Sequence, residues 1–332
     1  MKYLLSIFSS KRLIWRFVGH LALFALAILC AQTIIYWAYW KDTFSLPLRN
    51  ENIIHQGTPI LYFGDSVLKS REKNSPESST LPNLLQAQMP QTPIGTLQNG
   101  GYSADMYLAY GDYIVRESYH PRLCIFEINM RSFSNGWDLR PEWQFVQEKL
   151  TLSHGVLFRI FFRPLSVFKA FNLTPVTQEE FDHAPVFDGE RMAGQVMDYL
   201  GPASRAMVGD MFVLDYMHVL QKDHRKVRDL ITLCKMLRSH GIEPFFYITP
   251  VDYQTGDHYL GPRFEKRLGD NVEMIERELA EAGCCPLDLS RSLGPEAFDW
   301  RVVAFPNEHL NLKGRREVVK RLTCSSKQLG PF

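Results

Sequence analysis

One serine and one histidine, far apart in the chain, have the types and surroundings that acyl transfer requires. Ser66 ends the motif Gly-Asp-Ser at 64–66, directly after the apolar run at 59–63. A serine in a tight turn at the end of a buried strand is a common position for a nucleophile. His309 precedes a helical pattern near the end of the chain. Because a serine hydroxyl needs a base to remove its proton, we predict that His309 activates Ser66.

Acyl transfer also needs hydrogen-bond donors for the oxyanion that forms on the substrate carbonyl. Gly101 and Asn129 follow two further predicted strands, at 94–98 and 123–128. A glycine lets its backbone N–H approach a ligand closely, and the asparagine amide is a neutral donor. We therefore expect an oxyanion hole made of Gly101, Asn129 and the backbone N–H of Ser66.

The elements that position these residues alternate between strand and helix, which is typical of a parallel sheet covered on both faces. Further strands are predicted at 244–249 and 286–289, and helices at 104–117, 211–239, 262–282 and 314–322. Residues about 132–205 interrupt this alternation and are predicted to be an insertion. Within it, 155–171 is rich in phenylalanine with scattered arginine and lysine. That stretch fits either a helix on a membrane surface or a helix packed on the domain.

The amino-terminal region predicts a membrane anchor. Residues 1–40 hold four basic residues and no acidic one. Because the whole chain has a net charge of +1, residues 41–332 carry a net charge of −3. No charged residue occurs from Leu21 to Trp40, a length that matches a bilayer core. The positive-inside rule places the amino terminus in the cytoplasm and the domain in the periplasm or outside the cell. The alternative is a signal peptide cleaved after 25–27.

The expected organisation is an anchor at 1–40, a polar linker at 41–57 and a domain at 58–332. With 37 basic and 36 acidic residues, the composition argues against a nucleic-acid-binding protein. The histidines and cysteines lack metal-ligand spacing, so we expect no metal and no cofactor.

The cysteines divide into two groups by their surroundings. Cys124 and Cys234 lie in apolar stretches and are expected to be buried thiols. An exported domain could oxidise two cysteines, and Cys284, Cys285 and Cys324 form the group to test for a bridge, which the sequence leaves open.

The motifs at 64–66, 99–101 and 127–129, together with His309, resemble the SGNH (GDSL) hydrolase superfamily over about residues 58–325. The resemblance implies a flavodoxin-like three-layer α/β/α sandwich with a central parallel sheet, preceded here by one transmembrane helix. It also implies the same nucleophile, base and oxyanion donors. The anchor and the phrases at 129–133 and 247–250 are similar to those of envelope members of this superfamily. Such members help to transfer acyl groups to cell-surface polymers, commonly beside a membrane-bound O-acyltransferase.

The chain also departs from the family pattern. The family usually has an aspartate three residues before its histidine, where this chain has Pro306. Glu308, Asp299 or a backbone carbonyl near Pro306 remains as the group that orients the histidine. Glu127 replaces a glycine and Met130 replaces an aspartate in the asparagine motif.

These observations predict an extracytoplasmic esterase or O-acyltransferase that forms an acyl-enzyme. The expected substrate is a cell-envelope polysaccharide or another acyl ester, with acetyl as the simplest group. Hydrolysis and transfer are not distinguished by the sequence. Because the family aspartate is missing, the alternative is a non-catalytic assembly or polymer-binding partner of a membrane-bound O-acyltransferase.

Overall fold

A computed structural model gives the fold of this chain. It describes residues 2–40, 45–69, 79–134, 136–137, 145, 148–154, 205–298 and 308–326. The chain divides into two compact units, residues 1–48 with 154–173, and residues 49–153 with 174–332. The first unit contains the amino-terminal helix, and the second contains a β-sheet and its covering helices.

The amino-terminal unit consists mainly of one long apolar helix. α1 covers Lys2–Ile35 and continues into a short π-helix at Tyr36–Trp40. Among the described residues, Ile14–Ala38 is the helical stretch long and apolar enough to cross a membrane, with 25 residues and a mean hydropathy of 2.1. This stretch overlaps the anchor predicted from the sequence.

The second unit is built on a parallel sheet. Its strands are β1 (Ile60–Gly64), β2 (Ile94–Gln98), β3 (Leu123–Ile128), β4 (Glu243–Ile248) and β5 (Leu287–Asp288). In the described part of the chain they lie in the order β2-β1-β3-β4-β5, and all neighbouring pairs are parallel. This is the strand order of a flavodoxin-like sheet.

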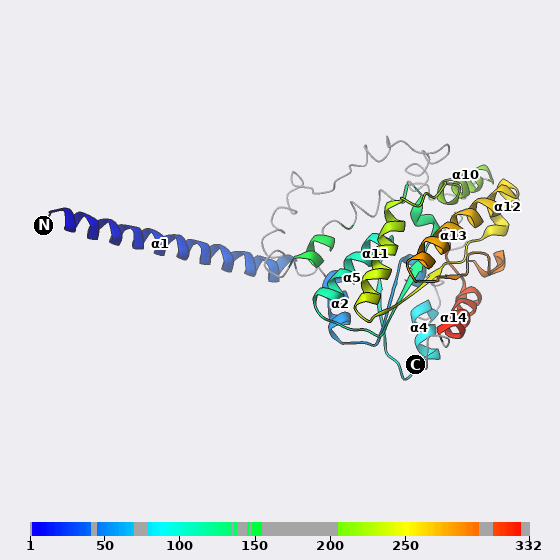
Figure 1. The fold of residues 1–332 in the computed structure, drawn as a ribbon, viewed down its shortest axis with the longest axis horizontal. Coiled ribbons are helices and arrows are strands. Elements are labelled where there is room, and N and C mark those ends of the chain that lie inside the picture. The colour runs from blue at the N-terminus through cyan, green and yellow to red at the C-terminus, as the bar shows by residue number, and fades with distance from the viewer. Residues whose placement is uncertain are drawn as a thin grey trace. The chain divides into compact units, whose positions relative to one another are not determined.

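Helices cover both faces of this sheet. They are α2 (Ser45–His55), α3 (Ser66–Lys69), α4 (Leu81–Gln88), α5 (Ala104–Arg116), α10 (Arg205–Tyr216), α11 (Arg225–Ser239), α12 (Tyr253–Leu260), α13 (Arg263–Glu281) and α14 (Leu312–Ser326). Ile60 and Tyr62 of β1 share a core with α4 and α14, whereas Phe63 packs on Tyr107 of α5. Figure 1 shows α5 and α11 on one side of the strands and α4 and α14 on the other. The predicted three-layer α/β/α class is therefore confirmed.

The single helix predicted over 211–239 is wrong, because the structure has α10 and α11 with a break between them. Asn271 of α13 replaces helical hydrogen bonds at this break. Its Oδ1 accepts from the Leu220 N–H at 3.0 Å, and its Nδ2 donates to the His218 carbonyl at 2.9 Å. The His224 ring then caps α11 by accepting from the Lys226 N–H. The apolar spacing continues across the break and hides it from a periodicity argument.

The stretch predicted as a linker contains a helix, α2. Asn50 in this helix is fully buried, and its Nδ2 donates to the hydroxyl of Tyr110 at 2.8 Å. Ile54 is also buried. The carboxyl-terminal half of α2 is therefore part of the folded second unit. Most of the predicted insertion at 132–205, including 155–171, lies outside the described residues.

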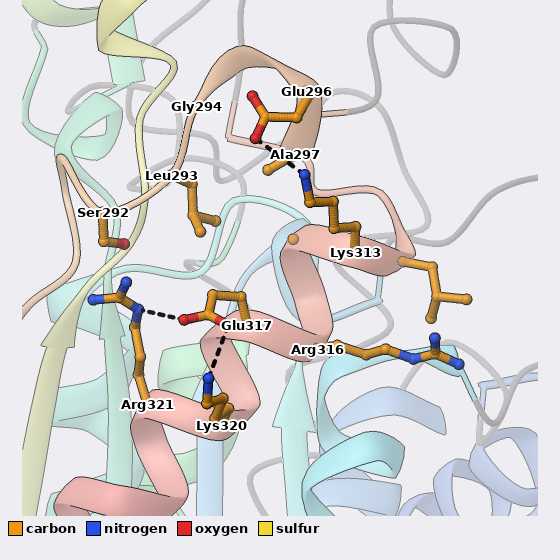
Figure 2. Close-up of a pocket in the computed structure, with 12 residues that line it drawn as sticks. Ser292, Leu293, Gly294, Glu296, Ala297, Lys313, Arg316, Glu317, Lys320 and Arg321 are labelled. Carbon is orange, nitrogen blue, oxygen red and sulfur yellow. Dashed lines mark hydrogen bonds and ion pairs between the residues drawn. The ribbon is translucent and has the colours of Figure 1, made fainter.

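The segment that carries His309 is held between a loop and the last helix. Phe298 and Leu310 form an antiparallel bridge. Gly314, in the first turn of α14, lies so close to the loop that an added Cβ would be 2.4 Å from the Ala297 carbonyl oxygen. A larger residue at Gly314 would push α14 away from the loop. Figure 2 shows this loop beside the start of α14, with residues from both lining a cavity.

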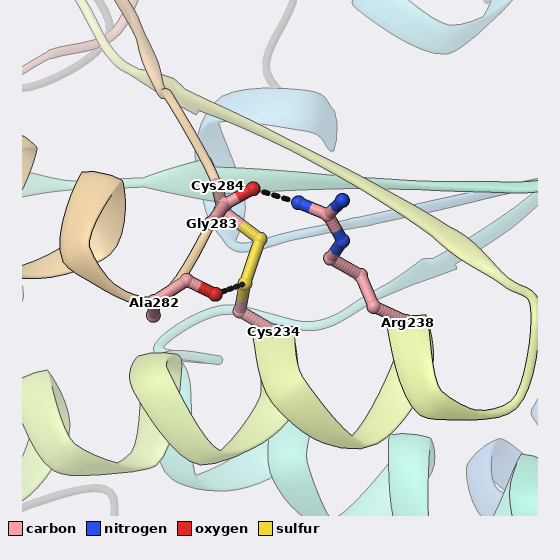
Figure 3. Close-up of a disulfide and its surroundings, with 5 residues drawn as sticks. All are labelled: Cys234, Arg238, Ala282, Gly283 and Cys284. Carbon is pink, nitrogen blue, oxygen red and sulfur yellow. Dashed lines mark hydrogen bonds between the residues drawn. A yellow bond between two sulfur atoms is a disulfide. The ribbon is translucent and has the colours of Figure 1, made fainter.

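One disulfide links two helical regions and corrects the cysteine assignment. Cys234 of α11 is bonded to Cys284, which follows α13 (Figure 3). Cys234 is therefore not the buried thiol that was predicted, and Cys285 and Cys324 are free and exposed. The pairing depends on how α13 lies beside α11, which the local sequence does not reveal. Cys124 is a buried thiol as predicted, and burial raises its pKa well above the ordinary value.

We expect the double variant Cys234→Ser/Cys284→Ser to lose about 2–4 kcal/mol of unfolding free energy, because the bridge closes a long loop in the unfolded chain. Urea unfolding of the full chain in mild detergent, followed by tryptophan fluorescence, measures this. Cys285→Ser is the matched control and should change stability little, because its thiol is exposed and unbonded. Equal stability of the double variant and the control would contradict the structural role of the bridge.

Candidate active site

Ser66 sits in a turn that close packing restricts. β1 ends at Gly64, and Ser66 begins α3. A Cβ at Gly64 would lie 2.5 Å from Leu68 Cδ1 and 2.7 Å from Glu127 Cδ, so only glycine fits there. The Asp65 carboxylate accepts from the backbone N–H of the residue after Ser66 at 2.7 Å. This hydrogen bond fixes the turn that presents the serine.

The structure brings the predicted base to the predicted nucleophile. His309 Nε2 lies 3.2 Å from Ser66 Oγ, although the two residues are 243 positions apart. His309 is 9% exposed, and Ser66 is partly buried. The distance allows a hydrogen bond from the serine hydroxyl to an unprotonated Nε2.

The predicted oxyanion donors follow strands that neighbour β1. Gly64 pairs with Gln98 of β2, and the residue before it pairs with Phe126 of β3, so the three strands end at one edge of the sheet. Gly101, just beyond β2, has a φ of 88°, a conformation that favours glycine. Asn129 directly follows β3.

The amide of Asn129 is engaged with a carboxylate beside Ser66. Its Nδ2 donates to Asp65 Oδ2 at 2.8 Å. Its Oδ1 accepts from the backbone N–H of Arg131. Asn129 therefore links the turn of Ser66 to the segment that follows β3.

Glu127 lies beneath the nucleophile turn and is fully buried. Its Oε1 accepts from the Asp65 N–H at 2.6 Å, and its Oε2 accepts from the Tyr247 hydroxyl at 3.1 Å. The Tyr247 hydroxyl also lies 2.7 Å from that of Tyr62. Burial, followed by the nearby Asp65 carboxylate, raises the pKa of Glu127 well above its usual range. In the sequence, Glu127 stands out only as a departure from the family pattern, and nothing there indicates a role for it.

Glu308 forms an ion pair with a residue that the sequence analysis missed. Arg131 Nη2 lies 2.5 Å from Glu308 Oε1, and the Tyr216 hydroxyl donates to Oε2 at 3.2 Å. Burial is the largest single effect and would raise the pKa of Glu308, but the charges of Arg131 and His309, with smaller favourable interactions, together lower it below its usual range. Arg131 also stacks on Trp137, with Cζ 4.3 Å from the ring centroid.

The ion pair between Arg131 and Glu308 affects which group can orient the His309 ring. The Glu308 carboxylate is bound by Arg131 and Tyr216, although its charge still acts on the adjacent histidine. Asp299 and Pro306, the other candidates, lie outside the described residues.

Two residues from the insertion hold the loop that follows Gly101. The hydroxyls of Tyr102 and Tyr110 both donate to Glu148, and Lys149 forms an ion pair with Asp105. All of these side chains except that of Lys149 are buried. This arrangement, called the Glu148–Lys149 clamp below, ties the predicted oxyanion loop to the insertion. The acid and base at 148–149 are adjacent in the sequence, but nothing there indicates their partners.

No protein-family model matches the sequence, and no curated protein matches it. Solved structures resemble it at low identity. TesA is 12% identical, with a TM-score of 0.43 over 82% of this chain and 99% of its own. A member of the lipolytic G-D-S-L family from Veillonella parvula is 9% identical, with a TM-score of 0.40 over 79% of this chain and 93% of its own.

A catalytic mutant of Axe2, an acetylxylan esterase from Geobacillus stearothermophilus, is 12% identical, with a TM-score of 0.38 over 79% of this chain and 90% of its own. One of these structures is described as a member of the lipolytic G-D-S-L family, which the sequence motifs resemble. At this level of similarity, the function of this chain must be argued from the geometry of its own site.

We expect Glu127→Gln to change how stability depends on pH. With its raised pKa, Glu127 keeps its proton in the folded state to a higher pH than in the unfolded chain. Its contribution to stability is therefore complete below the ordinary carboxyl pKa of 4.5 and is lost as pH rises through the folded pKa. Urea unfolding from about pH 5 to about pH 8 should show wild type losing stability relative to Glu127→Gln.

The companion variant Glu127→Ala should lose about 2–4 kcal/mol near pH 5, because it leaves a cavity and unpaired polar groups, and this loss relative to wild type should shrink as pH rises. Parallel pH profiles for wild type and Glu127→Gln would contradict a neutral buried carboxyl group.

We expect Arg131→Met to lose about 3–5 kcal/mol of unfolding free energy, because it leaves the Glu308 carboxylate buried without its cation. The double variant Arg131→Met/Glu308→Gln should recover part of this loss. Urea unfolding of the four proteins in this cycle measures the coupling. The exposed pair Lys266–Asp270 is the control, and its removal should cost at most about 1 kcal/mol. Strictly additive single effects at Arg131 and Glu308 would contradict the pairing.

Proposed function

We propose that this protein is a serine esterase or O-acyltransferase with Ser66 as nucleophile and His309 as general base. The observation that supports this most directly is the 3.2 Å contact between Ser66 Oγ and His309 Nε2. The serine stands at the carboxyl end of a central strand, where open parallel sheets bind their ligands.

The proposed reaction has two steps. His309 Nε2 takes the proton of Ser66 as Oγ attacks the acyl carbonyl, and the alcohol leaves with that proton as the acyl-enzyme forms. His309 then activates a water molecule or a glycan hydroxyl, which attacks the acyl carbonyl and releases Ser66 Oγ with its proton restored. Water gives hydrolysis, and a glycan hydroxyl gives transfer. Acetyl is the simplest acyl group for this scheme.

The proposed oxyanion donors are the backbone N–H groups of Ser66 and Gly101 and the amide of Asn129. The Nδ2 of Asn129 has two N–H groups, of which one donates to Asp65 and the other is proposed to serve the oxyanion. The ionised Glu308 lies next to His309 and favours the imidazolium that forms during each step. Asp299 remains a proposed alternative for the acid that orients the His309 ring.

The proposed location is outside the cytoplasm, with the chain anchored by Ile14–Ala38. Four basic residues lie at the amino side of the uncharged run that begins at Leu21, against two, Lys41 and Arg49, in the first fifteen residues after Ala38, which favours a cytoplasmic amino terminus. The Cys234–Cys284 disulfide gives independent support, because such bonds persist in oxidising compartments. A cell-envelope polysaccharide is the proposed substrate, and a membrane-bound O-acyltransferase is the proposed partner.

Fluorophosphonate labelling of the full chain in mild detergent tests the nucleophile. Wild type should be labelled, and Ser66→Ala should lose the label completely. His309→Ala should slow labelling by about 100-fold or more, because the serine loses its base. Ser239→Ala is the control, since Ser239 is exposed at the end of α11 and should not affect labelling.

The second candidate function is that of a non-catalytic assembly or polymer-binding partner. The pairing of Glu308 with Arg131 and the hydrogen bond from Asn129 to Asp65 favour it, because the side chains of Glu308 and Asn129 already have partners. A folded wild-type protein that binds polymer but takes no label would support this candidate and contradict an active serine.

A further inference from the structure

A cavity of about 730 Å³ lies between the loop before His309 and helix α14 (Figure 2). Leu293, Ala297 and Leu312 contribute apolar surface to its lining. Four basic and two acidic side chains also line it, which leaves a net charge of +2: Lys313, Arg316, Lys320, Arg321, Glu296 and Glu317. Its volume falls in the range of small-molecule sites, about 300–1,000 Å³.

Positive charge is concentrated on α14, although the chain after residue 40 is negative overall. Residues 41–332 carry a net charge of −3, whereas α14 has five basic residues and one acidic residue. One of the five, Arg315, is buried and donates to the carbonyls of Ser79 and Leu310. The other four line the cavity.

These four cations remain accessible to an anionic ligand. Lys313 contacts Glu296 at 3.1 Å and Arg321 contacts Glu317 at 3.1 Å, but these pairs are exposed to solvent. Exposed ion pairs contribute little free energy, so a ligand can replace them. Among the described residues, Arg316 makes no ion pair, and Figure 2 shows its guanidinium extending away from both acids.

The cavity adjoins the segment that carries the proposed base. Its apolar wall at Leu312 is three residues from His309, a distance of at most about 11 Å along an extended chain. Its lining also includes Ala297, next to the Phe298–Leu310 bridge that holds the same segment. A ligand in this cavity therefore lies within a few sugar units of Ser66.

We propose that this cavity is a subsite for an anionic sugar unit of the polymer that Ser66 acts on. Arg316 and its neighbours on α14 bind the carboxylate or phosphate group, and the apolar wall receives the C–H face of the ring. The hollow between the loop and α14, lined by both apolar and basic side chains, fits a sugar ring with an anionic group better than a flat lipid surface. This inference rests on the proposed function and assigns it a class of substrate, an acidic polysaccharide.

Binding of defined oligosaccharides tests the subsite. The full chain in mild detergent is titrated with oligogalacturonate, with its methyl-esterified neutral counterpart, and with polyphosphate, at low and high salt. Wild type should bind at least one of the two anionic probes at least ten times more tightly than the neutral one. The preference between carboxylate and phosphate then identifies the anionic group.

The variant Arg316→Ala/Lys320→Ala should weaken anionic binding at least tenfold and reduce its salt dependence. Lys222→Ala/Lys235→Ala removes the same charge from exposed positions elsewhere and should change binding less than twofold. Equal binding by the two double variants, or absence of binding to both anionic probes, would overturn the proposal. Preference for anionic lipid vesicles over all of these probes would also overturn it, in favour of a membrane contact.

Fluorophosphonate labelling of wild type distinguishes a failure of the proposed subsite from a failure of the proposed nucleophile. Labelling without charge-dependent binding rejects the subsite and keeps the proposed enzyme. Charge-dependent binding without labelling keeps the cavity as a binding site and rejects the nucleophile.

Discussion

The buried ion pair between Arg131 and Glu308 is the constraint on which the arrangement of the site depends. Arg131 belongs to the segment after β3, and Glu308 immediately precedes His309, so their attraction brings two distant parts of the chain together. Because both side chains are buried, separating them would leave two unpaired charges in a poorly solvated interior. Asn129 extends the connection to the turn of Ser66, and the contact from Ser66 to His309 closes it. The proposed nucleophile, the proposed base and the predicted oxyanion residue thus belong to one ring of contacts.

Two buried carboxyl groups, one in this ring and one beside it, differ in charge because their partners differ. Glu308 faces a guanidinium and is ionised, whereas Glu127 lies beside the Asp65 carboxylate, accepts from the Tyr247 hydroxyl and keeps its proton. A neutral group beneath the nucleophile turn avoids adding a second negative charge next to Asp65. The negative charge near the base is instead placed where it stabilises a protonated imidazole. Position in the fold, rather than residue type, decides which carboxyl group is charged.

Local sequence was sufficient for the strands, the nucleophile turn and the strand order, because each follows from a short pattern or a family motif. The proximity of Ser66 and His309 was also predictable, since both belong to motifs with a known chemical relation. The break between α10 and α11 was not, because Asn271 on another helix stabilises it. The pairing of Arg131 with Glu308 was hidden for the same reason. Each residue looks ordinary alone, and only the tertiary arrangement gives it a partner.

The Glu148–Lys149 clamp changes how the boundary of this domain should be drawn. An insertion that interrupts a regular fold is commonly treated as a removable addition to a complete core. Here its described part supplies the acceptor shared by Tyr102 and Tyr110 and the cation beside Asp105. A minimal domain designed by trimming the chain to sheet and helices would remove the clamp and leave these buried groups to find new partners. The described part of the predicted insertion is, in this respect, part of the scaffold rather than an accessory to it.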